Sequence, residues 1–85
     1  MSNNQQAIKI NIQYCGAWGY GSKAKQAEQI IKSVYPNADV QLQRDMGKTG
    51  NFEITCDGKL IHSKKKGEGF VNGIEDIQGK IEASL

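Results

Sequence analysis

The sequence predicts a two-layer α+β protein, in which one face of a four-stranded mixed sheet is covered by two helices. The chain has 85 residues, enough for one hydrophobic core. Four short stretches alternate apolar and polar residues, which indicates strands. Two longer stretches repeat apolar residues every three or four positions, as amphipathic helices do. In chain order the expected elements are β-α-β-β-β-α.

The first strand is expected over residues 7 to 14 and the first helix over residues 22 to 34. In the strand, isoleucines alternate with polar residues at Ile8, Ile10 and Ile12. In the helix, apolar residues recur at helical spacing: Ala24, Ala27, Ile30, Ile31 and Val34. Pro36 ends this pattern. The segment CGAWGYGS lies between the two elements, and its three glycines favour a tight turn.

The second half of the chain predicts a strand at Val40 and Leu42, then a hairpin and a helix. The hairpin pairs residues 52 to 56 with residues 59 to 62 across Asp57-Gly58, a dipeptide favoured in type I′ turns. The segment SKKKGEG is expected to be a charged loop. The last helix is expected to begin at Asn72, with Glu75 completing a capping box and an apolar face of Ile74, Ile77 and Ile81. A right-handed βαβ unit extended by a hairpin is compatible with a thioredoxin-like fold.

Composition bounds the functions to be considered. Eleven basic and nine acidic residues give a formal charge of +2, too weak to indicate nucleic-acid binding. No stretch approaches the roughly 20 apolar residues that span a bilayer. The polar segment 1–6 is expected to be a flexible N-terminus before a single domain over residues 7–85. With two cysteines and one histidine we expect reduced thiols in the cytoplasm, a monomer, and no metal, membrane or nucleic-acid partner.

The junction of the first strand and first helix is the main candidate site. Unpaired N–H groups at the start of a helix lower the pKa of a nearby thiol, and Cys15 lies there. In a strand-loop-helix redox motif a second thiol or selenol three positions later resolves the mixed disulfide. Here that position is Trp18. A free cysteine is also commonly a small buried apolar residue, so both roles are open for Cys15.

Three segments carry a family resemblance. The heptapeptide YCGAWGY at residues 14–20 resembles the Tyr-Cys-Gly-Ala-Sec-Gly-Tyr segment of the selenoprotein W/T/H family. The stretch GKLIHSKKKGEGFV at residues 58–71 is similar to the second signature of that family, and TGNFE at residues 49–53 is similar to its Thr-Gly-x-Phe-Glu segment. The resemblance extends over about residues 8–85. It implies a thioredoxin-like fold, a Cys-x-x-Sec or Cys-x-x-Cys centre and an antioxidant role in redox homeostasis. It further implies glutathione as co-substrate, with no bound cofactor, and association with 14-3-3 proteins.

The implied redox pair is Cys15 and the residue at position 18. The rest of the loop supports this pair: Tyr14, Gly16, Ala17, Gly19 and Tyr20. Trp18 departs from the family pattern because an indole cannot undergo thiol exchange, so the chain as written is predicted to be inactive in two-centre exchange. Two explanations are open. Trp18 stands in for selenocysteine, whose UGA codon differs by one base from that of Trp, or the gene encodes Trp and the chain is a redox-inactive interaction module.

Other candidates lie further along the chain. Ser63, Lys64, Lys65 and Lys66 form a basic segment that either contacts an anionic partner, such as a glutathione carboxylate, or is simply solvated. The aromatic residues of the loop form either a packed rim or an exposed docking patch. Cys56 has the parity of a core residue, and it can pair with Cys15 only if their Cα atoms lie within about 7 Å.

Overall fold

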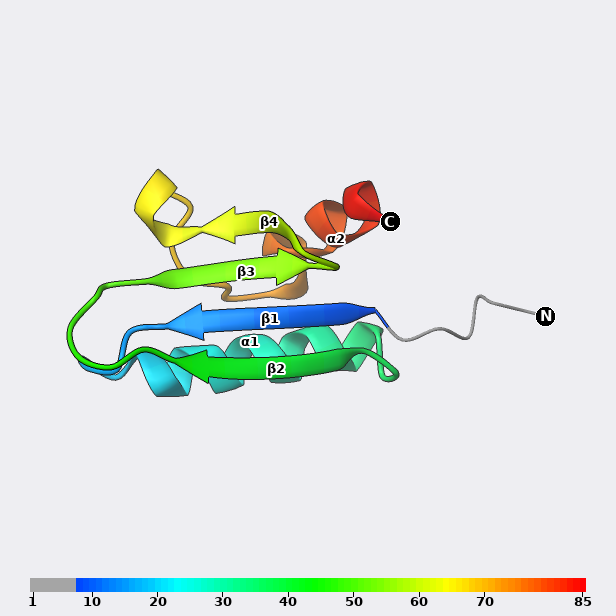
Figure 1. Cartoon of the computed structure of the whole chain (residues 1–85). Helices are drawn as coiled ribbons and strands as arrows, with labels where there is room; N and C mark the ends of the chain where they lie inside the picture. The colour runs from blue at the N-terminus through cyan, green and yellow to red at the C-terminus, as the bar shows by residue number, and fades with distance from the viewer. Residues whose placement is uncertain (1–7) are drawn as a thin grey trace.

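The computed structural model describes residues 8–85 and confirms the predicted order of strands and main helices (Figure 1). The elements are β1 (Lys9–Tyr14), α1 (Tyr20–Val34), β2 (Asp39–Arg44), β3 (Phe52–Cys56), β4 (Lys59–Ser63) and α2 (Gln78–Ser84), with short 3-10 helices η2 (Lys64–Lys66) and η3 (Ile74–Asp76). The predicted flexible segment 1–6 lies outside the described residues. Within residues 8–85, no helix combines the length and the apolar character needed to cross a membrane.

The four strands form one mixed sheet in the order β2-β1-β3-β4. β1 runs parallel to β2 and antiparallel to β3, and β3 runs antiparallel to β4. This confirms the predicted βαβ unit and the hairpin. At the hairpin turn Asp57 has φ 50° and Gly58 has φ 87°, the two positive values that a type I′ turn requires. Because β1 and β4 are both antiparallel to β3, they end at the same edge of the sheet.

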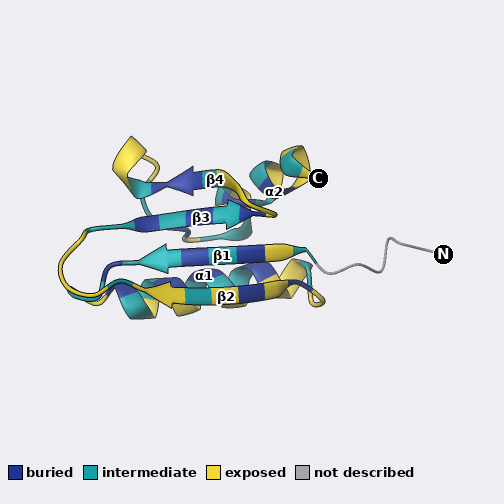
Figure 2. Ribbon diagram, viewed as in Figure 1, coloured by how far each residue is buried: buried dark blue, intermediate teal, exposed yellow. Residues whose placement is uncertain are grey.

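The core lies between the sheet and the two helices, which cover the same face of the sheet (Figure 1). β1 contributes Ile10 and Ile12 to this face, and the pairing register places Cys56 and Ile54 opposite them on β3. The helices complete it with apolar residues that are fully buried: Ala24, Ala27, Ile31 and Ile81. On Figure 2 the buried positions alternate with less buried ones along β1 and β3. That alternation is the one from which the strands were predicted.

The C-terminal segment differs from the prediction of one helix with a capping box. Glu75 does not cap Asn72; the backbone N–H of Asn72 donates instead to Asp76 Oδ2 at 3.0 Å. Gly73 is extended, and the Glu75 carboxylate lies so close to it that a Cβ would meet Oε1 at 2.6 Å. Ile77, with φ −134°, then interrupts the helical conformation before α2. The apolar spacing was therefore correct, but it is divided between two short helices.

Two smaller boundaries also differ. α1 begins at Tyr20 rather than at residue 22, because Gly19 takes a left-handed conformation and starts the helix two residues earlier. The basic segment expected to be a loop contains the 3-10 turn η2. Ser63 caps this turn, since its hydroxyl accepts the N–H of Lys66 at 3.3 Å.

Candidate functional site

The turn between β1 and α1 reverses the chain within a few residues. Trp18 has φ 60° and Gly19 has φ 75°, so two successive residues are left-handed. The N–H of Tyr20 donates to the carbonyl of Ala17 at 3.3 Å, and the Ser22 hydroxyl donates to the carbonyl of Gly19 at 2.9 Å. This turn brings Cys15 and position 18 to the edge of the sheet where β1 and β4 end.

Cys15 is buried, with 1% of its surface exposed, and its sulfur takes part in two hydrogen bonds. The backbone N–H of Ala17 donates to Sγ at 3.4 Å, and the thiol donates to the carbonyl of Gly47 at 3.6 Å. Burial alone would raise the pKa of Cys15. The backbone N–H groups of Gly50, Ala17 and Thr49, together with the Thr49 hydroxyl, outweigh burial and lower this pKa. Cys15 is thus a buried residue with a lowered pKa, and both sequence-based roles stay open for it.

The aromatic residues of the loop divide between core and surface. Trp18 is 65% exposed, whereas Tyr20 is buried. Tyr20 packs edge-on against Phe70 with ring centroids 5.1 Å apart, and the Trp18 ring lies 6.3 Å from that of Tyr20. Tyr14 is half buried on the other side of the loop, with its ring beside Gly21. The packed rim is therefore Tyr20 with Phe70, and the exposed aromatic side chain is that of Trp18.

The basic segment after β4 reaches this aromatic cluster through one of its lysines. Lys64 Nζ lies 5.7 Å from the centroid of Tyr20 and 5.5 Å from that of Phe70. Lys65 and Lys66 are exposed. Ser63 does not share that surface, because it is 2% exposed and its hydroxyl donates to Glu53 Oε1 at 2.6 Å. Ser63 therefore holds β4 against β3, and the exposed side chains of the segment are those of lysines.

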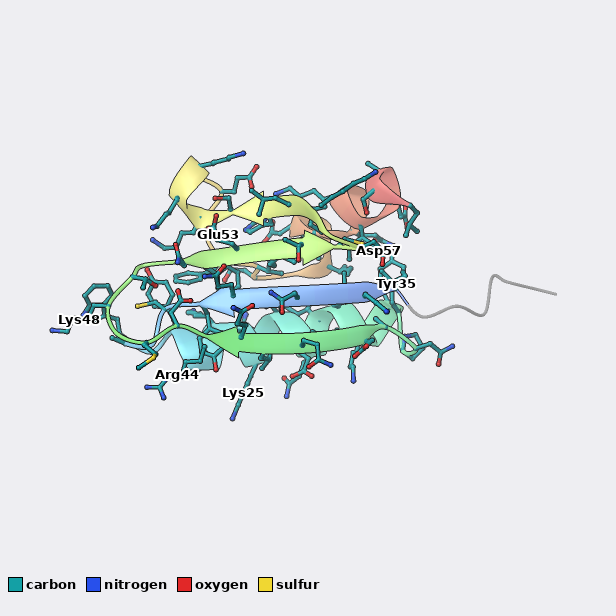
Figure 3. The ribbon with its side chains drawn as sticks, in the orientation of Figure 1. Lys25, Tyr35, Arg44, Lys48, Glu53 and Asp57 are labelled. Carbon is teal, nitrogen blue, oxygen red and sulfur yellow. The ribbon has the colours of Figure 1, made fainter. Side chains whose placement is uncertain are left out.

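A cavity of about 560 Å³ lies beside the Cys15 turn. It is lined by residues 14–22, by Lys25 of α1 and by Arg44 of β2. Arg44 Nη2 donates to the carbonyl of Gly16 at 3.0 Å. Figure 3 shows Arg44 and Lys25 extending at the same edge of the molecule. Neither Arg44 nor Lys25 belongs to a sequence motif, so the sequence alone did not indicate them. Within residues 8–85, neither side chain takes part in an ion pair.

Cys56 and His62 lie too far along the sheet to act on Cys15. Cys56 is opposite Ile10, five positions before Cys15, which corresponds to roughly 16 Å along a strand. A disulfide between the two free cysteines is therefore excluded in this fold. His62 is level with Ile54, and its ring bridges Gly69 O and Lys80 Nζ, each at 2.8 Å. Because the ammonium of Lys80 can only donate, Nδ1 accepts from it and Nε2 donates to Gly69.

Comparisons with known proteins establish the family and the fold of this chain. The Rdx family profile matches residues 9–81, a span that contains the Cys15 turn and the basic segment. The chain belongs to the Rdx family. Selenoprotein W of Macaca mulatta is 42% identical over 67 residues, covering 78% of this chain and 77% of that protein. Selenoprotein W of Gallus gallus is 34% identical over 82 residues, covering 92% and 96%.

A solved structure confirms the fold of this Rdx domain. The selenoprotein W-related protein from Vibrio cholerae superposes with a TM-score of 0.79 at 22% sequence identity, covering 92% of this chain and 96% of that one. The thioredoxin-like arrangement predicted from the order of elements is thereby confirmed.

Proposed function

We propose that this Rdx protein is a thiol redox protein in which Cys15 supplies the reactive thiolate and position 18 faces the substrate. The observation that carries the proposal is the set of N–H donors around Cys15. A sulfur buried for packing alone needs no such donors, whereas a thiolate does. Membership of a family whose relatives are selenoproteins W supports a redox-related role.

The different exposure of the two positions of the motif supports a different role for each. Cys15 is 1% exposed and Trp18 is 65% exposed. In two-centre exchange the accessible group forms the mixed adduct with the substrate, and the buried thiolate then attacks this adduct and releases the reduced substrate. Trp18 removes the accessible group, so the chain as written keeps only the second partner and cannot complete the exchange within itself.

Glutathione is the proposed co-substrate of the remaining thiol. The Cys15 thiolate attacks one sulfur of oxidised glutathione, the S–S bond breaks, and one glutathione leaves as a thiolate that takes a proton. The thiolate of a second thiol compound then attacks the glutathione sulfur of the mixed disulfide, which restores the Cys15 thiolate and transfers the glutathionyl group to that thiol. Lys25 and Arg44, which line the cavity beside Cys15, are the proposed partners of the glutathione carboxylates. Other cations near this end of the sheet would strengthen the attraction: Lys23, Lys48, Lys64, Lys65 and Lys66.

Mass spectrometry of the intact chain after incubation with oxidised glutathione tests the redox role. We expect one glutathione adduct, lost in Cys15→Ser and retained in Cys56→Ala. In Trp18→Cys we expect a species lighter by two hydrogens, since the new thiol at the exposed position can close a disulfide with Cys15. Absence of the adduct on the folded chain, with labelling seen only after denaturation, would refute the redox role.

The role of the two cavity cations has its own test. Iodoacetate and iodoacetamide alkylate thiolates by the same chemistry, but only iodoacetate is an anion. The ratio of the iodoacetate rate to the iodoacetamide rate should fall as salt is added, because salt screens the attraction. The ratio should also fall in Lys25→Gln and in Arg44→Gln. Lys32→Gln, further along α1, is the matched control and should leave the ratio unchanged. Equal ratios in all variants would rule out these cations as the anion contact.

The exposure of Trp18 favours one second candidate, a redox-inactive interaction module. In that case Trp18 and Lys64 form part of a partner surface, and Cys15 has no chemical role. The alkylation rate of Cys15 against pH separates the two functions. A midpoint well below the usual thiol value of about 8.5 supports redox chemistry, and an inert thiol supports the interaction module.

A further inference from the structure

The loop between β2 and β3, residues 45–51, closes over the buried side of Cys15, and we call it the clasp. It is the long connection that Figure 1 shows at the edge where β1 ends. Three backbone hydrogen bonds join it to the segment around Cys15. Asp45 N–H donates to the carbonyl of Tyr14 at 2.8 Å, Cys15 N–H donates to that of Asn51 at 2.8 Å, and Gly16 N–H donates to that of Gly47 at 3.0 Å. The clasp thus contacts the residues on both sides of the thiol.

One carboxylate holds the two ends of the clasp together. The Thr49 hydroxyl donates to Asp45 Oδ2 at 2.5 Å, and the Asn51 side-chain amide donates to the same oxygen at 2.8 Å. Gln13 of β1 donates to Oδ1 at 2.8 Å. The backbone N–H of Asn51 also reaches Thr49 Oγ1 at 3.3 Å. These bonds hold the pKa of Asp45 below its usual range, so the carboxylate stays charged and keeps accepting them at neutral pH.

The residues that Asp45 orders are the ones that donate to Cys15. Hydrogen bonding with Thr49 and Gly50 of the clasp lowers the pKa of Cys15, the thiol donates to Gly47 of the clasp at 3.6 Å, and the Ala17 N–H donates to Sγ from the turn at 3.4 Å. A loop of this kind has no strand or helix hydrogen bonds of its own to fix these groups. Their positions therefore depend on the anchoring of Thr49 and Asn51 to Asp45.

We propose that Asp45 is a positioning residue for the Cys15 thiolate: its carboxylate anchors Thr49 and Asn51 and so holds the clasp against the segment that carries the sulfur. This inference rests on the proposed redox role of Cys15, and it adds a residue that contacts neither Cys15 nor position 18 through its own carboxylate.

The proposal can be tested because two effects of removing the charge have opposite signs. A negative charge close to a thiolate disfavours it, so by Coulomb interaction alone Asp45→Asn would lower the pKa of Cys15 and speed its alkylation. If Asp45 acts by ordering the clasp, Asp45→Asn raises this pKa and slows alkylation. The amide of Asn has one oxygen and one NH₂ group, and the NH₂ group cannot accept the hydrogen bonds that a carboxylate oxygen of Asp45 accepts. The direction of the change decides between the two.

The assay is the rate of iodoacetamide alkylation of Cys15 between pH 5 and pH 10. Loss of one charge-assisted hydrogen bond lowers the thiolate population at pH 6 to 7 by about tenfold. A more basic thiolate is also a better nucleophile, which leaves alkylation about threefold slower. We expect this slowing in Asp45→Asn and in Asn51→Ala, which removes a donor to Asp45 without touching the sulfur, whereas Thr49→Ser, which keeps the hydroxyl, should react at the wild-type rate.

Asp39→Asn is the matched control, because it makes the same change of charge at the other end of β2 and should not alter the profile. Cys15→Ser gives the background from buried Cys56. Circular dichroism establishes that each variant is folded, and Asn51→Ala carries the test if Asp45→Asn is not. An unchanged or lower midpoint in the folded variants overturns the proposal. The measurement needs no redox partner, so a failure of glutathione exchange in the wild type would refute the proposed function and leave this result standing.

Discussion

Gly16→Ala should damage both the fold and the site, because Gly16 is the point where the Cys15 turn touches the clasp. A Cβ at this position would lie 2.3 Å from the backbone oxygen of Asp45 and 3.1 Å from that of Gly47. Contacts below 3.0 Å are essentially not tolerated, and both partners are backbone atoms, so the clasp has to move by at least about 0.7 Å. This movement would weaken the Gly16 N–H bond to Gly47. Overpacking of about 1–3 kcal/mol with one hydrogen bond of about 1 kcal/mol predicts a destabilisation of roughly 2–4 kcal/mol.

Gly21→Ala is the matched control in the same turn. A Cβ at Gly21 meets only the Tyr14 ring, at an ordinary contact distance of 3.7 Å, and Gly21 lies within α1. Alanine should therefore stabilise the helix by up to about 1 kcal/mol. Urea unfolding followed by far-UV circular dichroism measures both variants; Trp18 fluorescence is a poor probe because Trp18 is largely exposed in the folded state. A free energy of unfolding for Gly16→Ala within about 0.5 kcal/mol of the wild-type value, together with an unchanged rate of Cys15 alkylation, would contradict this prediction.

Three further predictions concern stability, each measured by urea unfolding. Ile54→Ala, at a fully buried position of β3, should cost about 2–5 kcal/mol, whereas Leu60→Ala at a half-exposed position should cost clearly less; similar losses would contradict the assignment of the core. The pKa of Asp45 is lower in the folded protein than in the unfolded chain. Its carboxylate therefore stabilises the fold at a pH above the pKa of the unfolded chain, and this stabilisation is lost as the pH falls through the pKa of the folded protein. The stability difference between wild type and Asp45→Asn should thus shrink from pH 6 to pH 3, and a constant difference would refute this. His62→Leu should cost about 1–3 kcal/mol, since the carbonyl of Gly69 loses its buried donor, and an unchanged stability would show that water replaces it.

The sequence predicted the fold well where one local signal decided each element. The alternation of isoleucines along β1 indicates which residues face the core, and the Asp57-Gly58 turn indicates the pairing at the start of the hairpin. An irregularity between Ile54 and Thr55, which neither signal indicates, then shifts the register by one residue, so that His62 rather than Ile61 lies opposite Ile54. The C-terminal segment was predicted less well because Ile74, Ile77 and Ile81 have helical spacing whether or not the helix is continuous. The break depends on the extended backbone of Gly73 and on its contact with the Glu75 carboxylate, which no spacing rule records.

Of the candidate site, the sequence indicated only the two positions of the redox motif. Cys15 and position 18 were found because a strand, a glycine-rich turn and a helix follow one another along the chain. Asp45 and Thr49 are 30 or more residues away and, in the sequence, are ordinary polar residues of a loop. They lie beside the Cys15 turn because β2 is parallel to β1, so the end of β2 lies next to the end of β1. The TGNFE resemblance did mark this segment, but without a role for any of its residues.

The surroundings of Cys15 favour chemistry over packing as the reason for its position. A thiol is a weak hydrogen-bond donor and acceptor, so a buried N–H group directed at sulfur gains less than one directed at a carbonyl. The backbone N–H of Ala17 nevertheless donates to Sγ at 3.4 Å, and hydrogen bonding with Gly50 and Thr49 of the clasp also lowers the pKa of Cys15. This arrangement is costly for a neutral thiol and favourable for a thiolate, since hydrogen bonds to a charged acceptor are roughly twice as strong. Cys15→Ser places a better neutral acceptor among the same donors, so the variant should fold at least as well while losing every adduct. A fold that tolerates the loss of this sulfur, in a site that cannot react without it, would identify the sulfur as the functional group.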